Sequence, residues 1–170
     1  MDLILTDRAL PSLPRHDQLH VVHVAEQRIA PCVGCFGCWI KTPGRCVIRD
    51  DAPAIYPRIA HCDRLLVVSR LFLGCYDLPM KRLMERSLPN QQAFIRIHHG
   101  ETHHIQRSVH PKQMTVVAYG AESDGEKALF ARFVTRNALN TLSEDCTIHF
   151  ADSEAQVDTL VEKAVAAWEN

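Results

Sequence analysis

The chain has 170 residues, an apolar fraction of 46% and a formal net charge of −1 at neutral pH. That length suits one domain with its own hydrophobic core, so we expect a single domain over residues 1–170. The balanced charge argues against a nucleic-acid partner, and no apolar stretch approaches the length of a membrane span, so no membrane partner is expected.

Short apolar runs rich in β-branched residues alternate with helical patterns along the chain, which predicts an α/β fold with a five-stranded parallel sheet. In chain order, the expected elements are strands Asp2–Thr6 and Leu19–Val24, helix Ala52–Ala60, strand Arg64–Ser69, helix Leu78–Ser87, a hairpin or long loop over Phe94–Gln106, strand Met114–Tyr119, helix Gly125–Leu142, strand Thr147–Phe150 and helix Glu154–Trp168. Asp50 and Asp51 are expected to cap the first of these helices, and Ser153 the last.

The connection between the first two strands is unusually short for a parallel pair. Only residues 7–18 join them, and Pro11 and Pro14 stand among these residues. A crossover helix needs about a dozen residues or more without an interior proline, so we expect no helix in this connection.

Four of the seven cysteines fall within fifteen residues, in the order C-x2-C-x2-C-x7-C, at Cys32, Cys35, Cys38 and Cys46. With no signal peptide in evidence, this cluster indicates a reducing, cytoplasmic compartment and thiol or metal chemistry. Gly34 and Gly37 would let successive sulfurs converge on a [4Fe-4S] cluster. Zinc, a redox dithiol and unligated thiols in a crowded turn remain alternatives.

The segment PCVGCFGCWIKTPGRCVIRDD, with the later RLLVVSRLFLGCYDLPMKRLMERSLP, resembles flavodoxin-like NAD(P)H-dependent FMN reductases and iron-sulfur flavoproteins. The cysteine loop and the stretch Cys46–Asp51 carry the closest likeness. The resemblance implies a flavodoxin-like three-layer sandwich, FMN at the carboxyl ends of the strands, NAD(P)H as electron donor, and a homodimer. An unidentified acceptor would take the electrons.

The same resemblance directs attention to particular side chains. After the first strand, Thr6 and Arg8 are the candidates for the FMN phosphate, together with Ser12. After the third strand, Ser69, Phe72, Gly74 and Tyr76 are the candidates for the flavin ring, where an aromatic side chain could stack or simply pack the loop. The first loop nevertheless has no glycine and two prolines, so the usual phosphate cradle is not expected there.

The sequence leaves further hypotheses open. The missing cradle also suits a flavodoxin-fold protein that has lost FMN and acts as a binding or assembly module, and the cysteines alone would suit a cluster-only electron carrier. The histidine-rich run His98–His104 could bind a metal, but imidazoles at this spacing converge mainly on a helix, and here a strand and loop are expected.

Overall fold

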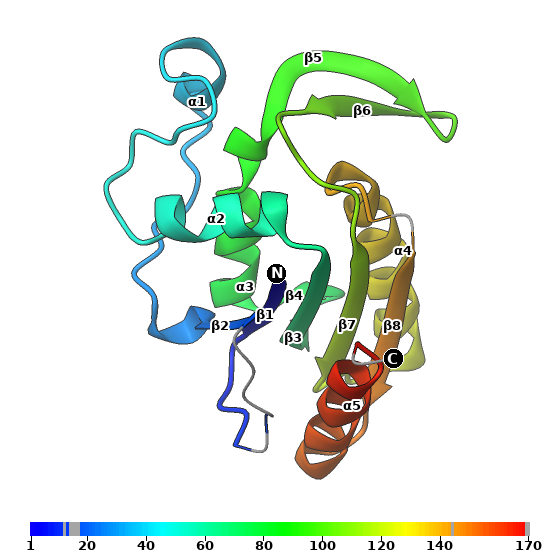
Figure 1. Cartoon of the computed structure of the whole chain (residues 1–170). Coiled ribbons are helices and arrows are strands. Elements are labelled where there is room, and N and C mark those ends of the chain that lie inside the picture. Colours follow the sequence, from blue (N-terminus) through cyan, green and yellow to red (C-terminus); the bar gives the residue numbers. More distant parts are fainter. Residues whose placement is uncertain (12, 14–17, 144, 169–170) are drawn as a thin grey trace.

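The computed structural model describes residues 1–11, 13, 18–143 and 145–168, and a twisted parallel sheet forms its centre (Figure 1). The strand order is β2-β1-β3-β7-β8, and every neighbouring pair is parallel. These strands are β1 (Asp2–Thr6), β2 (Leu19–His23), β3 (Arg64–Phe72), β7 (Gln113–Tyr119) and β8 (Cys146–Ala151). The predicted α/β fold and five-stranded parallel sheet are therefore confirmed.

Helices cover both faces of the sheet and give the three layers. One face packs against α2 (Ala52–His61), α3 (Leu78–Glu85) and α4 (Asp124–Asn140), and the other against α5 (Glu154–Ala166). Alternate residues of each strand face opposite sides, so Leu3 and Leu5 join the first core while Ile4 joins the second. No helix in the described part of the chain is long and apolar enough to cross a membrane.

The second face is covered less fully than the first. Its core combines Val157, Val161 and Val165 of α5 with strand residues, and Leu10 and Leu13 of the first connection pack against it. The described residues of that connection contain no helix, as predicted, while Ser12 and the predicted loop residue Pro14 lie outside the described part. The described residues of this connection therefore contribute apolar side chains in the layer where a crossover helix would usually lie.

The helices begin where the sequence predicts caps. Ser123 accepts a hydrogen bond from the Glu126 N–H at the start of α4, and Ser153 accepts one from the Gln156 N–H at the start of α5. The N-cap residue of α2 is Asp51, whose side chain makes no capping bond. The prediction that Asp50 and Asp51 cap this helix holds in part, because Asp51 occupies the N-cap position and Asp50 accepts a hydrogen bond from the Ala52 N–H at 3.2 Å. Both side chains also accept N–H groups of the preceding loop.

The middle of the chain adds an antiparallel hairpin of β5 (Gln91–His98) and β6 (Glu101–Gln106), which arches over one end of the molecule in Figure 1. The cysteine loop lies beside it and contains only one helical turn, α1 (Gly37–Ile40). The remaining short elements are η1 (Val24–Glu26), η2 (Leu88–Asn90) and β4 (Cys75–Tyr76), which extends the sheet by pairing antiparallel with the end of β3.

Candidate functional site

The carboxyl ends of β1, β3 and β7 meet at one edge of the sheet. The strand order reverses between β1 and β3, because the chain continues from β1 to β2 on one side and from β3 to β7 on the other. In open α/β sheets, ligands bind in the crevice outside the carboxyl ends at such a reversal. This edge is therefore the candidate site, and it contains Thr6, Ser69 and the other predicted flavin-contacting residues.

A partly buried carboxylate, Asp7, lies at the centre of this edge. Its Oδ2 accepts hydrogen bonds from the Arg70 backbone N–H at 2.7 Å and from the Ser69 hydroxyl at 3.0 Å. Its Oδ1 accepts one from the Tyr119 hydroxyl at 2.8 Å. Burial raises the pKa of Asp7 above its ordinary value although these hydrogen bonds act in the opposite direction. Three donors from β3 and β7 thus converge on a side chain of the protein itself.

The two residues predicted to hold the FMN phosphate are engaged elsewhere. The Thr6 hydroxyl is fully buried and donates to the Arg8 carbonyl at 2.8 Å, which closes a local turn. The Arg8 guanidinium donates to the Glu154 carbonyl at 3.1 Å and lies 3.7 Å from an Asp158 carboxylate oxygen. Arg8 therefore fastens the first loop to α5.

The ring candidates lie on the tight hairpin that joins β3 to β4. Leu73 and Gly74 form its two-residue turn, and both have positive φ angles, of 51° and 72°. Phe72 beside them is 52% exposed and Leu73 is 78% exposed, so the hairpin presents an apolar tip. The Gly74 N–H donates to the Glu126 carboxylate at 3.0 Å.

Tyr76 has a different environment from Phe72. It is only 2% exposed, and its ring makes edge contacts with Phe130 at 5.1 Å and Phe133 at 5.7 Å between centroids. Of the two aromatic candidates in this loop, Tyr76 packs in the core and Phe72 is the one available to a ligand.

The cysteine loop is anchored by a buried ion pair. Both terminal nitrogens of Arg86 donate to Asp50, at 2.6 Å and 2.9 Å, and Asp50 also accepts from the backbone N–H groups of Ala30 and Ala52. Burial alone would raise the pKa of Asp50, but these hydrogen bonds and the Arg86 charge hold it below its ordinary value. Arg86 thus fixes the end of the cysteine loop.

The four clustered cysteines are free thiols, with Cys35 exposed and Cys32, Cys38 and Cys46 partly exposed. Burial, and secondarily the nearby Cys46, raises the pKa of Cys38. Thiolates suit an iron-sulfur cluster chemically. Their positions do not yet fit one, because no group of three or more His, Cys, Asp or Glu residues in the described ranges could hold a metal ion. The same finding gives no support to a metal site on His98–His104.

The cysteine loop contacts the β5–β6 hairpin through Trp39. Its indole N–H donates to the Leu88 carbonyl at 3.0 Å, and its ring lies 4.7 Å from the His104 ring between centroids. His103 is buried and contacts the side chains of Asn140 and Glu101 at 2.9 Å and 3.3 Å. These two histidines therefore have packing roles between the loop, the hairpin and α4.

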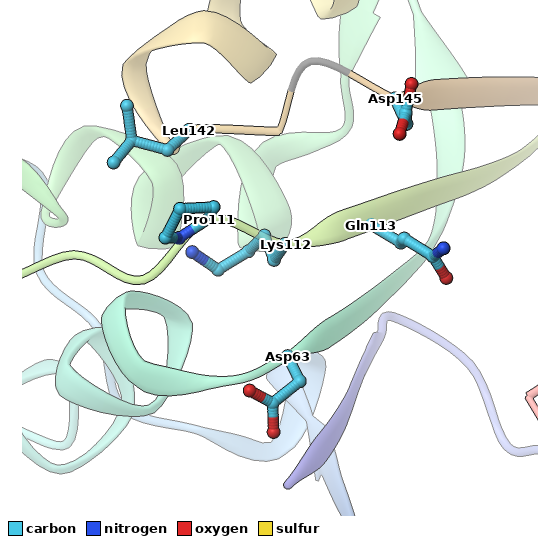
Figure 2. A pocket seen from close by; sticks show the side chains of 6 residues that line it. All are labelled: Asp63, Pro111, Lys112, Gln113, Leu142 and Asp145. Carbon is cyan, nitrogen blue, oxygen red and sulfur yellow. The ribbon is translucent and has the colours of Figure 1, made fainter.

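A hollow of about 550 Å³ lies at the opposite, amino-terminal end of the sheet (Figure 2). Asp63, Lys112, Gln113 and Asp145 are among its lining residues. The Lys112 ammonium group donates to the carbonyls of His110 and Thr141, and Asp63 pairs with the N-terminal ammonium group. The charges of Lys112 and Asp63 serve internal contacts, so this hollow is not the candidate site.

The sequence reasoning missed the residues that organise the edge. Asp7 and Tyr119 each stand at the end of a predicted strand, and that position was the available signal. Glu126 was hidden inside a helix pattern, yet its carboxylate accepts the backbone N–H groups of Gly74 and Glu122. The sequence could place these side chains at one edge but could not show that they satisfy one another's hydrogen bonds.

Comparison with solved structures supports the fold. An FMN-dependent NADH-azoreductase from Bacillus anthracis, solved in complex with FMN, superimposes with a TM-score of 0.63 over 100% of both chains at 12% identity. An NAD(P)H:quinone oxidoreductase from Methanothermobacter marburgensis gives a TM-score of 0.53 over 95% of this chain and 93% of its own, at 13% identity. The chain thus has the flavodoxin-like fold that its sequence resemblance implied.

One sequence relative adds a local likeness. An iron-sulfur flavoprotein of Methanosarcina thermophila is 31% identical over 67 residues, which is 39% of this chain and 34% of that protein. The match thus spans about a third of the relative's length. No family model matches the chain.

Proposed function

We propose that this chain is a flavodoxin-like oxidoreductase that carries electrons from NAD(P)H to an acceptor through a flavin. FMN is the flavin named for the azoreductase with the same fold. The observation that carries the proposal is the apolar tip of Phe72 and Leu73 at the carboxyl edge, beside the reversal of strand order. The free thiols agree with a reducing, cytoplasmic compartment.

The edge fits one part of FMN better than the other. The exposed Phe72 ring and the Leu73 side chain offer apolar contact to an isoalloxazine ring, and would exclude water from one side of it. The phosphate does not fit the described residues that end β1, because Asp7 takes the converging donors and Arg8 is paired with α5. When bound, a flavin supplies the hydride-accepting chemistry, and the protein supplies position and electrostatics.

An absorption spectrum of protein purified without oxygen tests the proposal first. Released flavin should be measured on the same sample, and the protein should then be titrated with FMN or riboflavin and with NADH or NADPH. The expected result is a two-banded flavin spectrum that bleaches on addition of the reduced nicotinamide. A protein that neither retains nor binds any flavin would instead favour the non-catalytic binding module.

A [4Fe-4S] cluster on the four cysteines is a subsidiary proposal. It is supported by the cysteine spacing and by the local likeness to an iron-sulfur flavoprotein. The loop would have to bring the four sulfurs together. About four irons and four sulfides per chain would be expected, and Cys38→Ser should lower both. Cys62→Ser is the matched control, because Cys62 is buried outside the loop; equal iron in both variants would contradict the cluster.

A homodimer is the assembly we propose. Phe94, Ile95 and Ile97 of β5 are 69%, 61% and 73% exposed, which is unusual for apolar side chains on a two-stranded hairpin. Light scattering should give twice the chain mass, and replacing Ile95 and Ile97 with Thr should shift it toward the monomer. A monomeric wild-type protein would reject the dimer without affecting the flavin proposal.

A further inference from the structure

The end of β1 already contains the negative charge that a phosphate would bring. Ser69, the Arg70 N–H and Tyr119 point their protons at the Asp7 carboxylate from three directions. Converging neutral donors of this kind form an anion-binding concavity. Here the anion is a side chain of the chain itself, covalently fixed at the first residue after the strand.

A second carboxylate closes the neighbouring group of backbone donors. Glu126 accepts the N–H of Gly74 at 3.0 Å with one oxygen and that of Glu122 at 2.8 Å with the other. These two N–H groups belong to the loops that follow β3 and β7. The described donors on both sides of the β3 end are therefore occupied by acidic side chains.

Two described arginines near this edge, Arg8 and Arg70, already have internal partners. Arg8 lies between the Glu154 carbonyl and the carboxylates of Glu154 and Asp158. The Arg70 guanidinium lies 3.7 Å from an Asp77 carboxylate oxygen. An incoming anion would compete for each of these groups with an internal partner.

A phosphate monoester carries between one and two negative charges at neutral pH. At the end of β1 it would face Asp7 and would have to displace Asp7 from its three donors. A flavin without the phosphate brings the same ring to Phe72 and Leu73 and meets no such opposition. The difference between the two ligands is therefore electrostatic and is concentrated on one side chain.

We propose that Asp7 makes this site selective for a flavin that lacks the 5′-phosphate, so that riboflavin binds in preference to FMN. The inference rests on the proposed flavin function and specifies which flavin the site accepts. Asp7 is its specificity-determining residue, acting through like-charge repulsion and through the donors that it withholds.

The test compares the affinities of riboflavin and FMN at one pH and ionic strength, by quenching of flavin fluorescence. The wild-type protein should bind riboflavin about tenfold more tightly than FMN. Asp7→Asn removes the charge and keeps the shape, since its amide oxygen can accept from Ser69 and Arg70 while Tyr119 accepts from its NH₂ group. This variant should bind FMN more tightly and leave riboflavin affinity nearly unchanged.

Asp63→Asn is the matched control, because it removes one exposed negative charge that pairs with the N-terminal ammonium group at the opposite, amino-terminal end of the sheet. It should leave the ratio of the two affinities unchanged. Tighter binding of FMN than of riboflavin by the wild-type protein would overturn the inference and leave the flavin function intact. A ratio that Asp7→Asn does not change would overturn it too. Failure to bind either flavin would reject the proposed function itself.

Discussion

Two aspartates of this chain, Asp50 and Asp7, are both surrounded by donors and yet differ in electrostatic state. Asp50 faces the buried Arg86 guanidinium and two backbone N–H groups, and its pKa lies below the ordinary value. Asp7 faces two hydroxyl groups and one N–H group, and it has no direct cationic partner among the described residues; its pKa lies above the ordinary value. Hydrogen bonds alone do not compensate for the burial of a carboxylate, whereas a buried cation does.

The difference separates an anchoring region from a site. The Asp50–Arg86 pair ties the cysteine loop to the end of α3 and leaves no charge uncompensated. The Asp7 network places a carboxyl group with a raised pKa at the edge of the sheet where a ligand would bind. Perturbed carboxyl groups in a crevice are frequent at functional sites.

The largest expected loss of stability comes from breaking the ion pair between Asp50 and Arg86. Arg86→Ala should lower the free energy of unfolding by about 3–5 kcal/mol, because it leaves Asp50 buried without its cation. Urea denaturation at pH 7 measures this loss. Lys81→Ala is the control on the same helix, since its exposed pair with Glu85 should contribute only about 0.3–0.5 kcal/mol. Similar losses in the two variants would show that the pair does not anchor the loop.

A smaller loss of stability is expected from removing a hydrogen bond to Asp7. Tyr119→Phe removes one donor to Asp7 and keeps the ring, so at pH 8 it should cost about 1.5–3 kcal/mol, as for a hydrogen bond to a charged group. In an Asp7→Asn background the same change should cost only about 0.5–1.5 kcal/mol, since both partners are then neutral. The double-mutant cycle gives the coupling directly, and additive losses would mean that the hydroxyl does not serve the carboxylate.

The sequence predicted the strands and helices of this protein better than the side-chain contacts of its candidate site. Val67, Val68, Val116 and Val117 mark strands buried on both faces, and the spacing of prolines excluded a helix after β1. The predicted strand Arg64–Ser69 ended too early, because β3 continues to Phe72 by pairing with β4. That pairing depends on a turn in which Leu73 has a positive φ angle. Leucine rarely adopts this conformation, so the sequence did not predict the turn.

The candidate site was only partly predictable for a related reason. Thr6, Arg8 and Ser69 were correctly placed at the carboxyl edge by their positions in the chain. The partner of each residue depends on groups more than sixty residues away along the chain, such as the Glu154 carbonyl for Arg8 and the Asp7 carboxylate for Ser69. Periodicity and spacing report local structure, so they carry no information about that choice.

The smallest effect, and the one that most directly contrasts the two carboxylates, is the pH dependence of two asparagine variants. Asp7 has a raised pKa in the folded protein, above the ordinary aspartate value of 3.8. Its protonated form therefore contributes stability that is full below pH 3.8 and is lost as the pH rises through the folded-state pKa. Asp7→Asn should therefore gain stability relative to the wild-type protein over that pH interval.

Asp50 has a lowered pKa, so its contribution to stability is present above pH 3.8 and is lost only as the pH falls through its folded-state pKa. The deficit of Asp50→Asn should accordingly be full at pH 7 and shrink only in acid. Urea midpoints and slopes measured from pH 3 to pH 8 give the free energy of unfolding of both variants relative to the wild-type protein. If Asp7→Asn becomes less stable than the wild-type protein as the pH rises, the Asp7 charge is compensated after all.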